Sequence, residues 1–268
     1  MQDSRGILLS KVIVVKGEHR EQMIPEALDH FEKPQLGRII LKPNLINSSP
    51  PPTTTPCQTI KSIAGYFYKE FEVIIAEGTG WGETSDAYQA LGYSEIARDY
   101  NIELVDLNED KYEIRRNPEA SFVKEFEFPL TLDDAYIISV PILKTHSLTT
   151  VTLSLKNMLG ATLGDKTSAV FRKGRFHRRL NESIIDINLY IKPDLAIIDG
   201  VVGGTGGELR ARPKEVGVII ASKDLVAADA VGANMLGYDP LSINHLKLAQ
   251  SKGLGVADLS KIEIIEVS

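Results

Sequence analysis

The sequence predicts an α/β protein with a largely parallel sheet flanked by helices. Short apolar runs rich in Val and Ile recur along the 268 residues, separated by segments whose apolar residues have helical spacing. This pattern is typical of a parallel sheet covered on both faces. The hydrophobic content of 43% is enough for a large core. With no internal repeat or low-complexity linker, we expect residues 1–268 to form a single domain, with two lobes around a central cleft as the alternative.

Strands are predicted where the apolar runs are bounded by polar or turn-forming residues. In chain order they occupy residues 11–15, 38–41, 73–76, 102–105, 135–140, 195–198, 216–221 and 262–267. Residues 111–128 differ from these runs, because charged and aromatic side chains alternate there, as in Phe126, Glu127 and Phe128. This alternation predicts a short antiparallel excursion from the main sheet.

Helices are predicted between the strands. Pro56 suits the first position of a helix that has Thr55 as its N-cap, and Ile60, Ile63 and Phe67 follow at helical spacing. The other predicted helices are residues 21–31, 94–100, 150–159, 177–190, 225–236 and 242–250.

Polar residues follow six of the predicted strands. In open α/β sheets, ligands bind beyond the carboxyl ends of the strands, so these residues mark the expected site. They are Lys42-Pro43-Asn44, Glu77-Gly78-Thr79-Gly80, Asp106, Lys144-Thr145-His146, Asp199-Gly200 and Lys223-Asp224. This is more charge at strand ends than solubility requires.

The Lys144-Thr145-His146 segment is predicted to be a turn that leaves a buried strand. A lysine there can fix a carboxylate or phosphate, or act as a base if burial lowers its pKa. His146 is a candidate general acid/base or metal ligand. Taken alone, the three residues favour a solvated turn whose histidine is satisfied by the backbone, so a functional role depends on what lies around them.

The predicted helix 150–159 follows this turn. Thr152 and Lys156 share one face of it, Asn157 lies beside them, and Gly160 is placed to end the helix as a left-handed C-cap. This face is a candidate to return toward His146. An ordinary amphipathic helix with a solvent-exposed lysine is the alternative.

Two glycine-rich loops are candidate ligand loops. The loop that contains Gly78 can present backbone N–H groups to an anion, although it matches neither a P-loop nor a dinucleotide fingerprint. The second loop, residues 203–208, precedes Arg210 and Arg212. A lid that clamps an acidic substrate has this composition, and so does a loop without fixed structure.

Two carboxylates are candidate metal ligands together with His146. Asp199 could bind a divalent metal, orient His146 or cap a turn. Asp229 lies among small apolar residues of a predicted helix, where a buried carboxylate needs a lysine, a cluster of backbone N–H groups or a metal as its partner.

Composition excludes several classes of protein. The net charge of -6 provides no general field for a nucleic-acid backbone, so nucleic acid is not an expected partner even though residues 172–179 form a basic stretch. Cys57 is the single cysteine, which excludes an internal disulfide and an all-cysteine metal cluster. No apolar run approaches ~18 residues. We expect no membrane span and a cytoplasmic location.

The motifs together resemble the domain of unknown function 362 family, from about residue 42 to residue 237. They are Lys42-Pro43-Asn44-Leu45, Thr55-Pro56, Val140-Pro141-Ile142-Leu143-Lys144-Thr145-His146, Leu155-Lys156-Asn157-Met158-Leu159-Gly160, Ile198-Asp199-Gly200 and Ser222-Lys223-Asp224 with Ala228-Asp229-Ala230. Many members carry a ferredoxin-like iron–sulfur module that this sequence lacks, so the resemblance implies no intrinsic iron–sulfur cluster. It also implies one shared site for Lys144, His146, Lys156, Asn157, Asp199 and Asp229.

We therefore expect an enzyme that acts on a small anionic metabolite, either a carboxylate or a phosphate ester. Lys144, Lys156 and His146 are its candidate catalytic groups, with His146 transferring a proton, and a divalent metal held by His146 with Asp199 or Asp229 is a variant. The candidate substrate-binding residues are Lys42, Asn44, Gly78, Thr145, Asn157 and Arg210. The alternative is a non-catalytic accessory or assembly factor for a metallocentre or iron–sulfur enzyme. A homo-oligomer or a protein partner is compatible with both.

Overall fold

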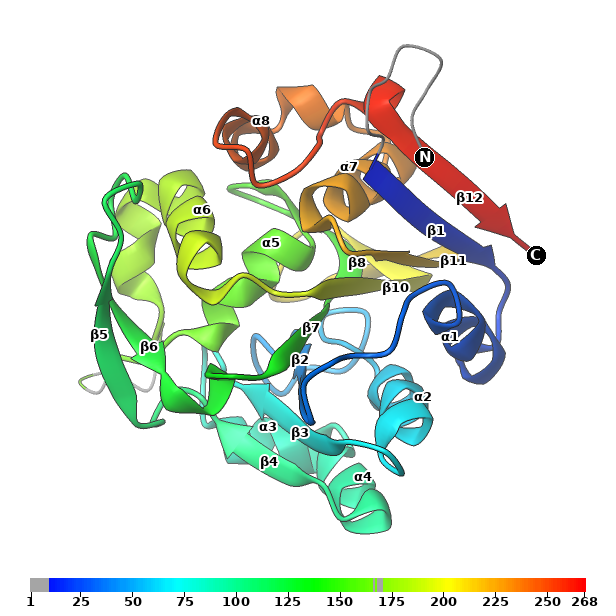
Figure 1. Cartoon of the computed structure of the whole chain (residues 1–268), viewed down its shortest axis with the longest axis horizontal. Coiled ribbons are helices and arrows are strands. Elements are labelled where there is room, and N and C mark those ends of the chain that lie inside the picture. The colour runs from blue at the N-terminus through cyan, green and yellow to red at the C-terminus, as the bar shows by residue number, and fades with distance from the viewer. Residues whose placement is uncertain (1–9, 166, 168–170) are drawn as a thin grey trace.

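The computed structural model describes residues 10–165, 167 and 171–268, and it has one large central sheet with helices on both faces (Figure 1). The strand order is β12-β1-β11-β10-β7-β2-β3-β4. The bounds are β1 (Ser10–Lys16), β2 (Arg38–Pro43), β3 (Glu72–Glu77), β4 (Glu103–Asp106), β7 (Tyr136–Val140), β10 (Leu195–Thr205), β11 (Arg212–Ser222) and β12 (Ile262–Val267). The predicted α/β fold with a largely parallel sheet is confirmed.

Strand directions decide which loops meet at one edge of the sheet. β2, β3, β4, β7 and β10 are mutually parallel, whereas β11 runs antiparallel to both β10 and β1. Ser222 at the end of β11 therefore pairs with Ala196 at the start of β10. The prediction that Lys223-Asp224 joins the other strand ends is wrong, because an antiparallel strand delivers its carboxyl end to the opposite edge.

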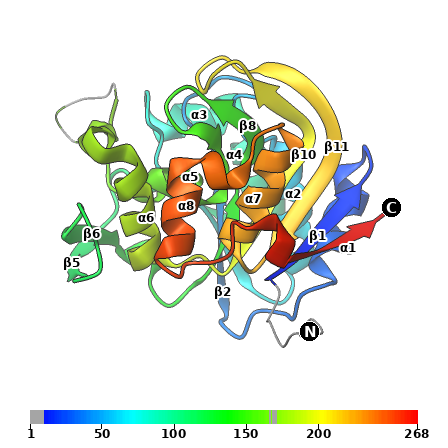
Figure 2. The ribbon, with the colours of Figure 1, turned by 90° about the horizontal axis from the view of Figure 1, so that it is seen from above.

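Alternate residues of the strands feed two separate cores. Val12 and Val14 of β1 face one core, and Ile13 and Val15 face the other, as a period of two requires in a sheet covered on both sides. The first core lies under α5 (Ser154–Asn157), α6 (Leu180–Ile191), α7 (Leu225–Met235) and α8 (Asn244–Ser251), and the second under α1 (Arg20–Leu28), α2 (Cys57–Phe67), α3 (Thr84–Ala90) and α4 (Tyr93–Tyr100) (Figures 1 and 2).

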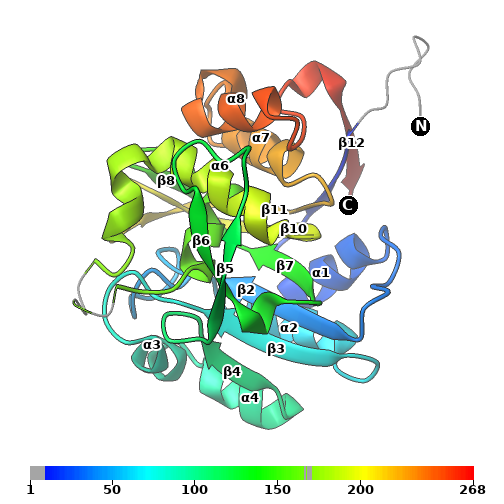
Figure 3. The ribbon, with the colours of Figure 1, turned by 60° about the vertical axis from the view of Figure 1, so that its left-hand side comes forward.

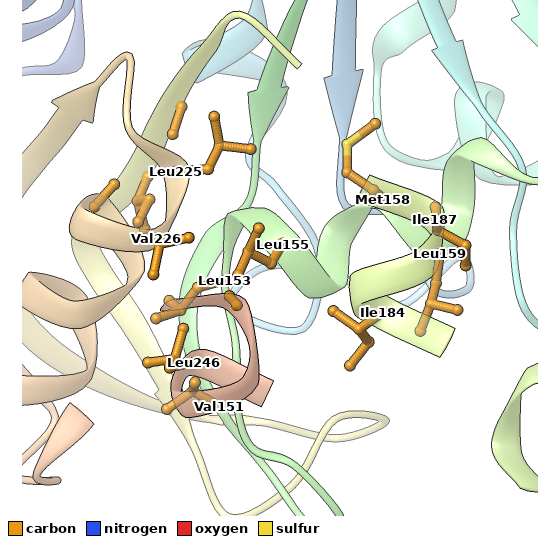
Figure 4. Close-up of a cluster of buried hydrophobic side chains, with 14 of the residues drawn as sticks. Val151, Leu153, Leu155, Met158, Leu159, Ile184, Ile187, Leu225, Val226 and Leu246 are labelled. Atoms are coloured by element: carbon orange, nitrogen blue, oxygen red, sulfur yellow. The ribbon is translucent and has the colours of Figure 1, made fainter. Parts of the chain in front are cut away.

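The segment that carries Lys156 is fixed by the first core. Apolar side chains before and after this residue pack against α6, α7 and α8 (Figure 4). They include Val151, Leu153, Leu155, Met158 and Leu159 from this segment, and Ile184, Ile187, Val226 and Leu246 from the helices. Each such side chain contributes roughly 1.5–3 kcal/mol when it is fully buried. The neighbouring polar residues are thereby held on a rigid base.

The antiparallel excursion is confirmed as a hairpin of β5 (Tyr112–Arg116) and β6 (Glu125–Pro129), which lies beside α6 (Figure 3). The ring of Phe126 stacks on that of Tyr190 in α6 with centroids 4.9 Å apart. The carboxylate of Asp186 accepts N–H groups from the loop between the two strands. One stacking contact and one buried carboxylate thus attach the hairpin to the main fold.

Two helix predictions were wrong in detail. Thr55 does not cap α2, because its hydroxyl donates to the carbonyl of Val140 and accepts the N–H of Asn44. The predicted helix 150–159 is divided. Thr150 has a left-handed φ of 66° and begins a short strand, β9 (Thr150–Thr152). α-Helix appears only in α5, and 3-10 helix follows it over Met158–Ala161. Pairing with β8 (Ile142–His146) overrides helical spacing there.

Candidate functional site

One cavity of about 170 Å³ lies where β2, β3 and β8 end. It occupies the edge of the sheet at which ligands were expected. The polar residues that line it are Asn44, Glu77, Lys144, His146, Thr152, Lys156, Asn157, Lys173, His177 and Glu208. Residues from three of the six predicted strand ends therefore meet here, together with the α5 segment and two later loops.

Lys144 and His146 lie on strand β8 and not on the turn that the sequence predicted. Side chains alternate along a strand, so these two residues face the same side and both line the cavity. Thr145 points away, and its hydroxyl accepts the N–H of Gly206 at 3.1 Å. Thr145 does not line the cavity, so the structure does not support its predicted contact with a substrate.

The Lys144 ammonium is almost completely buried and donates to the carbonyl of Thr53 at 2.6 Å. Burial, together with the positive charge of Lys156, lowers the pKa of Lys144 to about 7. An amine in this state is about half protonated near pH 7, so it can take up or release a proton there.

His146 is held as a neutral hydrogen-bond donor. Its Nδ1 accepts the backbone N–H groups of Leu148 at 3.0 Å and Thr149 at 3.4 Å, so the ring proton lies on Nε2. Burial, with the charge of Lys156, lowers the pKa of His146 to about 3. Neither ring nitrogen then has a lone pair available for a proton at neutral pH. This geometry argues against a role as base, and against metal binding, because a ligating histidine normally donates its other N–H.

Lys156 is buried at the cavity with no hydrogen-bond partner for its Nζ among the residues that the structure describes. Burial lowers the pKa of Lys156 to about 8, and the carboxylate of Glu208 opposes this shift. Two more lining residues carry buried oxygens that lack a partner in the described part of the chain, namely Asn44 through Oδ1 and Thr152 through Oγ1. Buried polar groups are rarely left unpaired, so these groups are suited to meet a ligand.

The floor of the cavity is a satisfied ionic network. Lys42 Nζ donates to Glu77 Oε2 at 2.8 Å and to Asn157 Oδ1 at 3.0 Å. Asn157 in turn donates from Nδ2 to the carbonyl of Lys42 and to the hydroxyl of Ser139. Lys42 does not line the cavity, and the amide of Asn157 is fully engaged. These two predicted substrate-binding residues therefore support the site.

Two glycines allow the backbone to pack against this floor. The N–H of Gly78 donates to the carbonyl of Gly160 and to Glu77 Oε1, so it is not free for an anion. Gly160 does not have the left-handed C-cap conformation that the sequence predicted, because 3-10 helix continues through it. A Cβ at Gly160 would lie 2.0 Å from Glu77 Oε1 and 2.6 Å from Lys42 Nζ. Close approach to the ion pair, and not a helix end, requires glycine here.

Two cations of the basic stretch 172–179 turn inward, Arg172 and Lys173, whereas its three other arginines are exposed. Lys173 lines the cavity and donates to Asn108 Oδ1 at 2.7 Å and to the carbonyl of Thr162, and burial lowers the pKa of Lys173 to about 7. Arg172 pairs with Glu83 at 2.6 Å. Sequence reasoning did not single out Lys173, because nothing in a run of cations shows which one turns inward.

Asp199 and Asp229 do not line the cavity. Asp199 pairs with Arg20 at 2.6 Å and accepts the hydroxyl proton of Thr59. Asp229 accepts the N–H groups of Ser154 at 2.6 Å and Leu155 at 2.9 Å, while burial raises the pKa of Asp229 to about 7. Its partner is thus the cluster of backbone N–H groups. Among the described residues, no group of three or more His, Cys, Asp or Glu side chains is placed to hold a metal ion.

The second glycine-rich loop reaches the cavity through Glu208 and Leu209. Arg210, the predicted substrate clamp, is exposed and does not line it. Glu208 accepts from the backbone N–H of Ser147 at 3.2 Å, and its Oε2 lies 3.9 Å from His146 Nδ1. The loop therefore brings a carboxylate to the cavity where a cation was expected.

In the part of the chain that the structure describes, no helix has the length and apolar character needed to cross a bilayer.

Comparison with known proteins identifies the family. The model described as Domain of unknown function (DUF362) matches residues 39–234, a range that contains every residue lining the cavity. A relative is the Thylakoid-associated protein sll1697 of Synechocystis sp., which is 26% identical over 232 residues, or 85% of this chain and 71% of the relative. The resemblance inferred from the motifs is confirmed. Since the match covers most of the sequence, the chain belongs to the DUF362 family.

Proposed function

We propose that this protein is an enzyme that acts on a small anionic metabolite, a carboxylate or a phosphate ester. The observation that carries the proposal is the side chain of Lys156, which is 9% exposed and forms no hydrogen bond or ion pair with a residue that the structure describes. It lines a cavity in which the buried Asn44 Oδ1 and Thr152 Oγ1 also lack a partner among those residues. A buried charge without a counter-ion is costly. A bound anion supplies that counter-ion.

The roles follow from the hydrogen bonds. Lys156 binds the anionic group, and the Nε2–H of His146 donates to a substrate oxygen. Lys144 transfers the proton, because the pKa of Lys144 is lowered to about 7 and a second charge beside it keeps the neutral amine populated. The proton-transfer role that the sequence suggested for His146 thus passes to Lys144.

Binding is the first test. Titration calorimetry with inorganic phosphate and with acetate is expected to show an interaction that weakens roughly tenfold to a hundredfold in Lys156→Met, since hydrogen bonds to charged groups contribute about 1.5–3 kcal/mol. Lys247→Met, at an exposed position on α8, serves as the matched control and is expected to bind like the parent. Equal affinities in the parent and Lys156→Met would refute the role of Lys156.

Turnover is the second test. The purified protein is incubated with mixtures of carboxylic acids and phosphate esters, and products are followed by mass spectrometry. Any activity found should disappear in Lys144→Met while the melting temperature stays close to that of the parent. Retained turnover in that variant would exclude Lys144 as the proton-transfer group.

The alternative of an accessory or assembly factor remains a prediction, as does the cytoplasmic location. The name of the Synechocystis relative gives a place, the thylakoid, and no reaction. A pull-down from native extract tests the alternative, which requires a stable complex with another protein. Metal analysis of protein purified without chelator tests the hypothesis that His146 holds a divalent metal. A metal-to-protein ratio near zero would refute that hypothesis.

A further inference from the structure

Part of the cavity wall is aromatic. Trp81, the single tryptophan of the chain, lies with its ring centroid 5.7 Å from that of Phe171 at an interplanar angle of 49°. Phe171 in turn lies 4.5 Å from the ring of His177. All three residues line the same cavity as Lys156. The site therefore combines a cationic end with a wall of π faces.

Aliphatic side chains extend this apolar wall. Leu45 and Ile46 line the cavity beside Trp81, and Leu148 and Leu209 line it from other loops. Leu148 is 66% exposed and Phe171 is 42% exposed. Large apolar side chains left exposed around one cavity are typical of a ligand-binding site, where a ligand covers them. A small anion such as acetate would leave this wall uncovered.

The position of Phe171 is maintained against local strain. Its φ is 62°, in the left-handed region that a bulky residue rarely adopts. Gly174 leaves room for the ring, because a Cβ there would lie 2.7 Å from Phe171 Cδ1. Strained residues that the surrounding structure holds in place are concentrated at ligand sites. Phe171 thus lines the cavity with a backbone conformation that is unfavourable for its residue type.

We propose that the ligand is an acid that carries a flat ring, with its anionic group at Lys156 and its ring against Trp81 and Phe171. This inference rests on the proposed function and narrows its substrate class. Aromatic rings pair with one another in tilted or offset arrangements and gain more than burial alone provides. A ring on the ligand uses both the π faces and the apolar wall.

The test compares acids that share a head group and differ in the body. Acetate, cyclohexanecarboxylate and benzoate are titrated by calorimetry, together with inorganic phosphate and phenyl phosphate, and Trp81 fluorescence is recorded in parallel. Benzoate is expected to bind more tightly than cyclohexanecarboxylate by roughly twofold to tenfold, and than acetate by on the order of tenfold or more. Because the protein has one tryptophan, a change in its emission places the ring at this wall.

Variants separate stacking from simple burial. Phe171→Leu keeps an apolar side chain but removes a π face, so it should bring the affinity for benzoate down toward that for cyclohexanecarboxylate. Tyr68→Leu changes an exposed aromatic residue that does not line the cavity, and it should leave the preference intact. A preference for benzoate that is undiminished in Phe171→Leu would overturn the proposed ring contact.

The outcomes distinguish the two proposals. If aromatic and non-aromatic acids bind equally well and all lose affinity in Lys156→Met, the inference about the flat ring is overturned and the proposed anion site stands. If none of the five probes binds, both are overturned. Tighter binding of the ringed member of each pair, lost in Lys156→Met, supports both.

Discussion

Lys42 and Lys156 are both buried beside the same cavity, but they differ in their partners. Lys42 donates to Glu77, Asn157 and the carbonyl of Pro43. Lys156 has no hydrogen-bond partner in the described part of the chain. Burial lowers the pKa of each lysine, and a carboxylate opposes the shift at each, Glu77 at Lys42 and Glu208 at Lys156. The difference is that Glu77 also forms a hydrogen-bonded ion pair with Lys42.

This difference separates a supporting charge from a binding charge. Burying an ion is costly, and a partner with good geometry offsets the cost within the protein itself. At Lys42 the hydrogen bonds to Glu77 and Asn157 offset the cost of burying the charge, so Lys42 stabilises the floor of the cavity. Lys156 has no such partner among the described residues, and under the proposed function a bound anion would take that place. The number of partners, and not burial, distinguishes the two lysines.

The sharpest test compares Lys42→Met with Lys156→Met in thermal and chemical unfolding. Lys42→Met leaves the Glu77 carboxylate buried without its cation, and should lower the free energy of unfolding by about 3–5 kcal/mol. Lys156→Met removes an unpaired charge that repels Lys144, and should change stability by less than about 1 kcal/mol.

A double variant provides the control for this comparison. Glu77→Gln combined with Lys42→Met removes both charges, and its loss of stability should be smaller than the sum of the two single losses. Strictly additive losses, or equal destabilisation by Lys42→Met and Lys156→Met, would contradict the distinction between a supporting and a binding lysine.

A smaller loss of stability is expected from Gly160→Ala. The added methyl group would meet Glu77 Oε1 and Lys42 Nζ, so the ion pair must shift, at a cost of roughly 1–3 kcal/mol. Gly37→Ala is the matched control, because a Cβ there meets nothing within 4 Å. Circular dichroism melts of the two variants measure the difference, and a Gly160→Ala variant as stable as Gly37→Ala would show that the floor is loosely packed.

The fold could be predicted from sequence where one periodicity dominates. Runs of Val and Ile such as those of β1 and β3 have no competing interpretation. The predictions were wrong where distant partners decide the conformation. The helical spacing of residues 150–159 gave way to pairing of Thr152 with Lys144, and the direction of β11 depends on its neighbours in the sheet and not on its own residues.

The site could be located from sequence, but its roles could not be assigned. The strand-end rule correctly brought Asn44, Lys144 and His146 to one cavity. Whether a lysine is paired or free depends on residues far away in the sequence, as Lys42 and Glu77 illustrate. The sequence did not predict the aromatic wall, because Trp81 and Phe171 lie 90 positions apart in loops without a regular hydrophobic pattern. No local pattern records such a meeting.

The pH dependence of anion affinity gives a third test of the comparison. The ammonium of Lys156 is charged below its pKa, which burial lowers to about 8. Affinity for benzoate should therefore be highest below pH 7 and fall about tenfold between pH 7 and pH 9, because one unit of pKa corresponds to a tenfold change in the charged fraction. Calorimetry across this range measures it, with Lys247→Met as the control. A flat profile would mean that no buried lysine provides the binding charge.

The smallest effect is expected from Glu208→Gln, which keeps an oxygen that can accept from Ser147. Glu208 raises the pKa of Lys156, and it also repels an incoming anion. Removing its charge should increase benzoate affinity roughly twofold to fivefold at pH 6, as expected for a partly exposed charge.

Glu208→Gln also lowers the pKa of Lys156, so the fall in affinity with rising pH begins at a lower pH. The two effects oppose each other above pH 8, and the affinity curves of parent and variant should converge or cross there. Parallel curves would show that Glu208 repels the ligand without influencing Lys156, and identical curves would place Glu208 outside the field of the site.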